Sequence, residues 1–163
     1  MTPVSPDAVS ADAVVSDAVF TEPELAFLRD QPLGRFATVG PDGAPQVRPV
    51  AFTVDPTTGT VDVAGMRNPS TQKWRNVARD GRAALVVDDV GTGGGWNPRA
   101  LEIRGTAEVL PDVLPEGAFP GAAPGVIRIR PVRILSYGID DAGPGNRWVR
   151  RPDSPAAAGT VAG

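Results

Sequence analysis

Within residues 99–109 of this 163-residue chain, apolar and polar side chains alternate from Leu101 to Val109. Leu101 and Ile103 fall on one face of such a segment, and Glu102 and Arg104 fall on the other. A period of two is typical of a β-strand that turns one face to the core and the other to solvent. The segment therefore predicts a β-sheet with one buried face.

Further segments with strand-type composition flank this one and are separated by turn sequences such as Pro-Asp-Gly. They cover residues 34–40, 46–54, 60–66, 82–90 and 125–140, the last interrupted near Pro131. Six strands joined mostly by short connections suit a closed or split antiparallel barrel. We therefore predict a mainly β fold with six strands and short helices.

Two short helices complete the pattern. Thr21 and Glu24 have the spacing of a capping box, which predicts a helix directly after them. Residues 71–81 predict a second helix, with Ser70 as its N-cap and Ala78 among the side chains on its inner face.

The chain divides into three parts. Residues 1–19 repeat Asp-Ala-Val with a period of five, which fits neither helix nor strand and predicts a disordered leader. Residues 20–141 form the folded domain, and residues 142–163 are expected to be a C-terminal tail. Because the chain shows no secretory signal, no membrane-spanning apolar run and no cysteine, we expect a cytoplasmic protein.

Composition excludes several kinds of chemistry. The chain contains no histidine, no cysteine and one tyrosine, so it lacks the residues for Ser-His-Asp or Cys-His catalysis and for the usual metal sites. We predict no metal site. The net charge of −3 argues against nucleic acid as a partner. Any catalysis would therefore depend on a bound organic cofactor.

Positive charge is nevertheless concentrated in the middle of the chain. Residues 46–82 hold six basic residues against three acidic ones. Arg48 lies on a predicted strand, while Thr71 and Lys73 lie at the start of the second helix, where backbone N–H groups lack partners. A hydroxyl, an ammonium and a guanidinium at such a place form a cradle for a phosphate. The alternative is an ordinary surface helix with solvated basic side chains.

These segments resemble the pyridoxamine 5′-phosphate oxidase-like flavin and deazaflavin oxidoreductases. The resemblance covers about residues 22–140 and is strongest in LGRFATVGPDGAPQVRPVAF, TQKWRNVARDGRAALVVDD and RALEIRGTAEVL. It implies a split β-barrel of the FMN-binding-protein type that forms a homodimer with the cofactor at the interface.

The resemblance also implies roles for individual residues. Arg48, Thr71 and Lys73 match the phosphate-binding motif of the family. The backbone of Pro49, Val50 and Ala51 would follow one side of the isoalloxazine-type ring, and Ala64, Gly65 and Met66 would line the other side.

Two positions depart from the flavin oxidases of this family. Gln72 stands where they have a second phosphate-binding arginine, and Ala100 stands where they have a glutamine against the flavin. The sequence is therefore closer to the deazaflavin branch, which uses coenzyme F420. The resemblance implies that Arg67, Arg75 and Arg79 would meet the acidic tail of that coenzyme.

The function implied is hydride delivery from reduced F420 to an activated C=C bond of a small molecule. Members of this branch act in the tailoring of polyketide antibiotics, including tetracycline-type skeletons. Tyr137 is the candidate proton donor, and Arg147 with Trp148 would cap the ring or substrate. The alternatives are an FMN-dependent flavin reductase or oxidase and a non-catalytic flavin-binding carrier.

Overall fold

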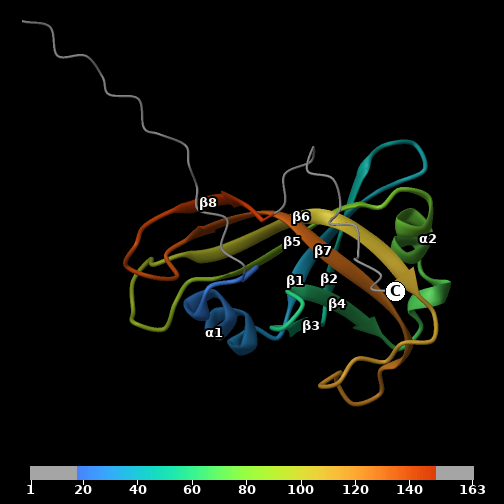
Figure 1. Cartoon of the computed structure of the whole chain (residues 1–163), viewed down its shortest axis with the longest axis horizontal. Coiled ribbons are helices and arrows are strands. Elements are labelled where there is room, and N and C mark those ends of the chain that lie inside the picture. Colours follow the sequence, from blue (N-terminus) through green and yellow to red (C-terminus); the bar gives the residue numbers. More distant parts are fainter. Residues whose placement is uncertain (1–17, 150–163) are drawn as a thin grey trace, which may run out of the picture.

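The computed structural model describes residues 18–149 (Figure 1). Antiparallel strands of one sheet make up most of it, which confirms the predicted mainly β class. The elements in chain order are α1 (Glu22–Asp30), β1 (Gly34–Val39), β2 (Pro45–Val50), β3 (Phe52–Asp55), β4 (Thr60–Gly65), the 3-10 turn η1 (Asn68–Ser70), α2 (Gln72–Arg79), β5 (Arg82–Asp89), β6 (Arg99–Leu110), β7 (Ala123–Tyr137) and β8 (Gly145–Trp148).

The sheet curls because its two outermost strands are joined by almost no chain. Its order is β2-β1-β5-β6-β7-β4-β3, and β8 pairs with β7 outside this path. Only Ala51 lies between β2, which pairs with β1, and β3, which pairs with β4. Since consecutive Cα atoms are about 3.8 Å apart, the two ends of the sheet meet within about 8 Å there. The result is the split antiparallel barrel that the sequence predicts.

Between residues 18 and 149 the sheet has eight strands instead of the predicted six. The segment predicted as one strand over residues 46–54 is divided at Ala51, because its two halves pair with different neighbours. The last strand, β8, lies in the segment 142–163, for which the sequence predicts a tail, and it pairs with β7. A strand of four residues is too short to display a clear period of two.

A bulge accommodates Pro131 inside the longest strand. The register of β6 with β7 shifts between Arg104 and Gly105, and Gly105 stands opposite Pro131. A Cβ at position 105 would lie 2.1 Å from the carbonyl oxygen of Arg130, so glycine is required there. The interruption predicted near Pro131 is therefore a register shift within one continuous strand.

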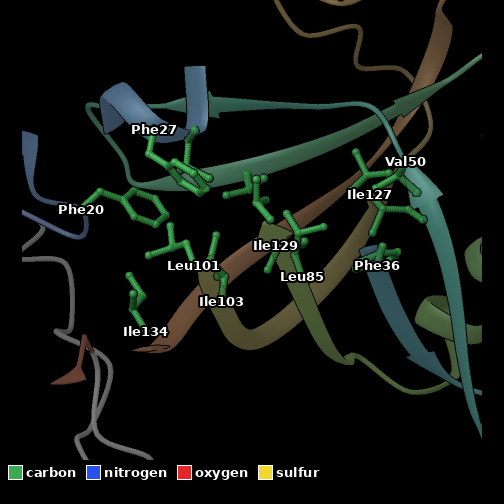
Figure 2. Packing of buried hydrophobic residues seen from close by; sticks show 14 of the residues in the cluster. Phe20, Phe27, Phe36, Val50, Leu85, Leu101, Ile103, Ile127, Ile129 and Ile134 are labelled. Carbon is green, nitrogen blue, oxygen red and sulfur yellow. The ribbon is translucent and has the colours of Figure 1, made fainter. Parts of the chain in front are cut away.

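The core fills the inside of the curled sheet (Figure 2). Leu101 and Ile103 are fully buried, as the alternation in residues 99–109 predicts, while Arg104 turns outward and pairs with Glu102. Phe20 and Phe27 close the end of the core beneath α1.

A buried ion pair fastens α1 to the last strand. The predicted capping box is confirmed, since Thr21 Oγ1 accepts from the Glu24 N–H and Glu24 Oε2 accepts from the Thr21 N–H. Glu24 is only 3% exposed, and its carboxylate also accepts hydrogen bonds of 2.7 and 2.5 Å from Arg147 of β8. Arg147 donates further to the Val19 carbonyl oxygen at 2.9 Å.

Most of the predicted leader, residues 1–17, lies outside the described residues, and so does the end of the chain from residue 150. No helix between residues 18 and 149 is long and apolar enough to cross a membrane. The cytoplasmic location stays a prediction.

We expect Arg147→Ala to lower the free energy of unfolding by about 3–5 kcal/mol, because it leaves the buried Glu24 carboxylate without its counter-charge. Urea denaturation followed by tryptophan fluorescence measures this loss. Arg130→Ala is the matched control, since Arg130 pairs with Glu108 on the surface and its removal should cost less than about 1 kcal/mol. Equal losses in the two variants would contradict a structural role for the buried pair.

Candidate functional site

Helix α2 begins one residue later than the sequence predicts. Its N-cap is Thr71, whose Oγ1 accepts a hydrogen bond from the Trp74 N–H at 3.4 Å. The prediction of Ser70 as N-cap is wrong, because the Ser70 hydroxyl donates to the Arg67 carbonyl oxygen at 2.9 Å and closes the turn η1. The first turn of α2 therefore presents backbone N–H groups beside Lys73.

A hollow of about 400 Å³ opens between the start of α2 and the strands β1 and β2. Its wall is formed by Phe36, Thr38, Gln46, Arg48, Pro49, Thr71, Gln72 and Lys73. The structure thus brings Arg48, Thr71 and Lys73 together at one place, from two elements that are separated in the chain. We call this hollow the α2 hollow.

The α2 hollow is positively charged. Arg48 and Lys73 are the charged residues in its wall, and no carboxylate lies among its lining residues. Within residues 18–149 neither side chain takes part in an ion pair. Burial lowers the pKa of the Lys73 ammonium below its ordinary value of 10.5, and the nearby Arg48 guanidinium lowers it further. A bound anion would offset both effects, so the hollow suits a phosphate.

The hydroxyl of Thr71 is engaged within the protein. It donates to the Asn68 carbonyl oxygen at 2.7 Å, while its oxygen accepts from the Trp74 N–H and, at 3.5 Å, from the Lys73 ammonium. Thr71 therefore shapes the start of the helix and steadies Lys73 rather than presenting its own proton to the hollow.

Gln72 and Arg75 form a pair at the same helix start. Arg75 donates to Gln72 Oε1 through Nε at 3.2 Å and through Nη2 at 2.9 Å, and its Nη1 donates to the Ser70 carbonyl oxygen at 3.1 Å. Arg75 is thereby held beside Gln72, which lines the α2 hollow. Further along the helix, Arg79 donates to the Val39 carbonyl oxygen of β1.

Sequence reasoning missed the buried amide that joins α2 to the sheet. Asn76 is fully buried, and its Nδ2 donates to Thr38 Oγ1 at 3.0 Å and to Gln46 Oε1 at 2.9 Å. The prediction that Ala78 faces inward is wrong, because Ala78 is exposed and Asn76 takes the buried place beside Val77. One signal in the sequence could have indicated this contact. It is a polar residue, such as Thr38 in β1, on the same strand face as buried residues.

The residues predicted to line a ring lie at the closing corner of the barrel. Pro49 is exposed, Ala51 is half-buried, and the side chain of Val50 points into the core. Ala64 is buried at the end of β4, and Gly65 follows it.

Beyond Gly65 the chain turns into η1 through two exposed side chains. Met66 is 68% exposed, and Arg67 is also exposed. Asn68 follows, and its amide donates to the carbonyl oxygens of Val63 and Gly125. Its Oδ1 is the one buried side-chain oxygen or nitrogen of the described residues that lacks a hydrogen-bond partner.

Tyr137 and Arg147 lie away from the α2 hollow. Tyr137 ends β7, and the strands β1, β5 and β6 separate β7 from β2 in the sheet. Arg147 belongs to β8, which lies at the end of the molecule opposite α2 (Figure 1). Within one chain, Glu24 and the Val19 carbonyl oxygen engage the Arg147 guanidinium, and its contact with a cofactor stays a prediction. Among residues 18–149, no cluster of acidic side chains could hold a metal ion.

Comparison with known proteins agrees with this architecture. The family model for pyridoxamine 5′-phosphate oxidase matches residues 20–123. The 5a,11a-dehydrotetracycline/5a,11a-dehydrooxytetracycline reductase of Streptomyces rimosus is 43% identical over 121 residues, which are 74% of this chain and 84% of that protein.

Solved structures show the same likeness. The structure of an F420 reductase is 27% identical and covers 67% of this chain and 93% of its own, with a TM-score of 0.51. A conserved hypothetical protein of Mycobacterium tuberculosis is 22% identical, covers 90% of this chain and 98% of its own with a TM-score of 0.58, and shares the fold.

Proposed function

The chain belongs to the pyridoxamine 5′-phosphate oxidase family, and we propose that it is an oxidoreductase that uses reduced coenzyme F420 to reduce an activated C=C bond of a small organic molecule. The observation that carries this proposal is the α2 hollow. Arg48 and Lys73 converge there without a carboxylate among the lining residues. Such a wall favours a phosphate, which both F420 and FMN contain.

The surroundings of the hollow fit the rest of a flavin-type cofactor. In the described part of the chain β2 pairs only with β1, so one edge of its backbone has no neighbouring strand. Pro49 of β2 lines the hollow, and Ala51 follows directly after the strand ends. Backbone N–H and C=O groups at an open edge are available to the polar rim of a ring.

Charge next to the hollow favours F420 over FMN. Gln72, which lines the hollow, is uncharged, whereas Arg75 is held beside it by two partners, Gln72 and the Ser70 carbonyl oxygen. Arg67 lies directly before η1, and Arg79 ends α2. This arrangement supports a cofactor whose negative charge extends beyond a single phosphate.

When bound, reduced F420 supplies the hydride. The task of the protein is to hold the phosphate through Arg48 and Lys73, to align ring and substrate, and to exclude water. Tyr137 is the one phenol of the chain, and its side chain is 47% exposed at the end of β7. Because it lies away from the hollow of its own chain, it can serve as proton donor only as Tyr137 of the partner subunit.

The proposed substrate class rests on the Streptomyces rimosus relative, which is named as a dehydrotetracycline reductase. We infer that this chain acts on an electron-poor C=C bond of a polycyclic polyketide. Rigid, polar substrates of this kind would reach the cofactor across the open edge of β2.

A homodimer would complete the site. Val47, which precedes Arg48 in β2, is 55% exposed, and Met66, itself predicted to line the ring, is 68% exposed. A second hollow at β1 and β5 is lined in part by Ala37, Val39, Ala83 and Ala84, together with Thr38, Pro45, Gly105 and the side chains of Arg82 and Arg104. Exposed apolar surface of this kind supports association with a second copy.

We expect the purified protein to bind F420 and, with reduced F420, to consume a dehydrotetracycline-type enone. Lys73→Ala should weaken binding by about 1.5–3 kcal/mol, because it removes a hydrogen bond between charged partners. Quenching of cofactor fluorescence measures the affinity, and loss of enone absorbance measures turnover.

Arg130→Gln is the control, since Arg130 pairs with Glu108 on the surface and does not line the hollow. If the protein binds FMN more tightly than F420 and turns over substrate with FMN, then FMN replaces F420 as the proposed cofactor. Cofactor affinity without turnover of any acceptor would point to a carrier, and failure to bind either cofactor would overturn the proposal.

As the pH is raised, cofactor affinity should begin to fall at a pH below 10.5. The pKa of Lys73 is lowered in the free protein, so the ammonium loses its proton earlier than an ordinary lysine, and the phosphate then loses its partner. Titrations of the wild type from pH 7 to 10.5 measure this decline. Lys73→Arg keeps its charge across this range and should flatten the curve. An unchanged decline in Lys73→Arg would assign the effect to another group.

Static light scattering should show a dimer for the wild type. Val47→Glu places a charge on the exposed apolar edge and should give a monomer with weaker cofactor binding. Thr57→Glu, on the exposed turn between β3 and β4, is the control for added charge. A monomeric wild type that binds the cofactor tightly would exclude a shared site.

A further inference from the structure

A chain of hydrogen bonds runs from the surface of α2 to the wall of the α2 hollow. Arg75 donates to Gln72 Oε1, and Gln72 Nε2 donates to Asn76 Oδ1 at 2.8 Å. Asn76 Nδ2 then donates to Thr38 Oγ1 and to Gln46 Oε1. Thr38 and Gln46 both line the hollow.

Arg75, at the outer end of this row of hydrogen bonds, determines which atom donates and which atom accepts in each of them. A guanidinium has only donors, so the atom of Gln72 that faces Arg75 must be oxygen, and its amide nitrogen must face Asn76. Asn76 in turn offers its oxygen to Gln72 and its nitrogen to the strands. Thr38 therefore receives a hydrogen bond on its oxygen.

This polarity leaves the proton of the Thr38 hydroxyl for another acceptor. Thr38 is 4% exposed, and no hydrogen bond among the described residues uses that proton. The other hydroxyl in the wall of the hollow, that of Thr71, already donates to the Asn68 carbonyl oxygen. Thr38 is thus the hydroxyl of the hollow that has a proton to give.

We propose that Thr38 binds the anion in the α2 hollow through its hydroxyl proton and that Asn76 positions it. This proposal rests on the proposed function, because it requires an anionic group of the cofactor to occupy the α2 hollow. The two residues act together, because Asn76 also fastens α2, with Lys73, to β1 and β2. The ligand recognised is a phosphate monoester or diester.

Four variants test this assignment against a merely structural role. Thr38→Val should weaken F420 binding about 10-fold, whereas Thr38→Ser, which keeps the hydroxyl, should stay within about 2-fold of the wild type. Asn76→Ala should also lose about 10-fold, and the double variant Thr38→Val/Asn76→Ala should lose less than the product of the two single losses. The matched control is Val77→Ala, which removes buried packing from the same helix and should lower the melting temperature without changing the dissociation constant.

Titrations with F420, FMN and inorganic pyrophosphate separate the two proposals. The role of Thr38 and Asn76 is overturned if Thr38→Val binds F420 as tightly as the wild type does. It is also overturned if Val77→Ala weakens F420 binding as much as Asn76→Ala does. In either case F420 still binds the wild type, so the proposed function stands. Binding of pyrophosphate alone, with the same dependence on Thr38, supports the anion site and overturns the proposed function. A protein that binds none of the three probes overturns both.

Discussion

The single residue between β2 and β3 constrains the whole molecule. Strands that lie at opposite ends of the sheet are consecutive in the chain, so the sheet has to curl until its two ends meet at Ala51. Closure buries the inner side chains, among them Phe36, Leu85 and Ile127, in one continuous core. It also leaves the outer edge of β2 without a neighbour among the described strands. The place where the barrel closes is therefore the place where backbone groups remain open to a ligand.

The α2 hollow follows from that closure. Helix α2 packs against β1 and β6, and a buried amide, Asn76, in addition to the apolar Val77, connects it to Thr38 of β1 and Gln46 of β2. Apolar packing tolerates small shifts, whereas two directed hydrogen bonds from one side chain to the strands fix both distance and orientation. The helix start and Arg48 are thus held at a defined separation. A site for a charged group needs this precision because electrostatic interactions depend on distance.

Sequence patterns predicted the elements that depend on local periodicity. The alternation within residues 99–109 and the capping box of α1 involve residue types whose preference is strong in any context. The convergence of Arg48 with Lys73 joins two separate elements, and it was predicted from the chemistry of a phosphate cradle and from the family resemblance. The patterns failed where tertiary contacts decide. Ser70 is as good an N-cap as Thr71 by type, and only the turn η1 selects between them.

Arg147 shows the same limit for a charged side chain. An arginine fits an anion site by type, but in the structure Arg147 pairs with Glu24, which is 123 residues away in sequence. Gln72 illustrates the opposite case, in which an uncharged side chain positions a neighbouring charge. It lines the α2 hollow, and its carbonyl oxygen accepts two hydrogen bonds from Arg75. The wall of the hollow thus keeps two cations, Arg48 and Lys73, while a third is held directly beside it. Where a charge lies in this site therefore depends on neutral neighbours as much as on the charged residues themselves.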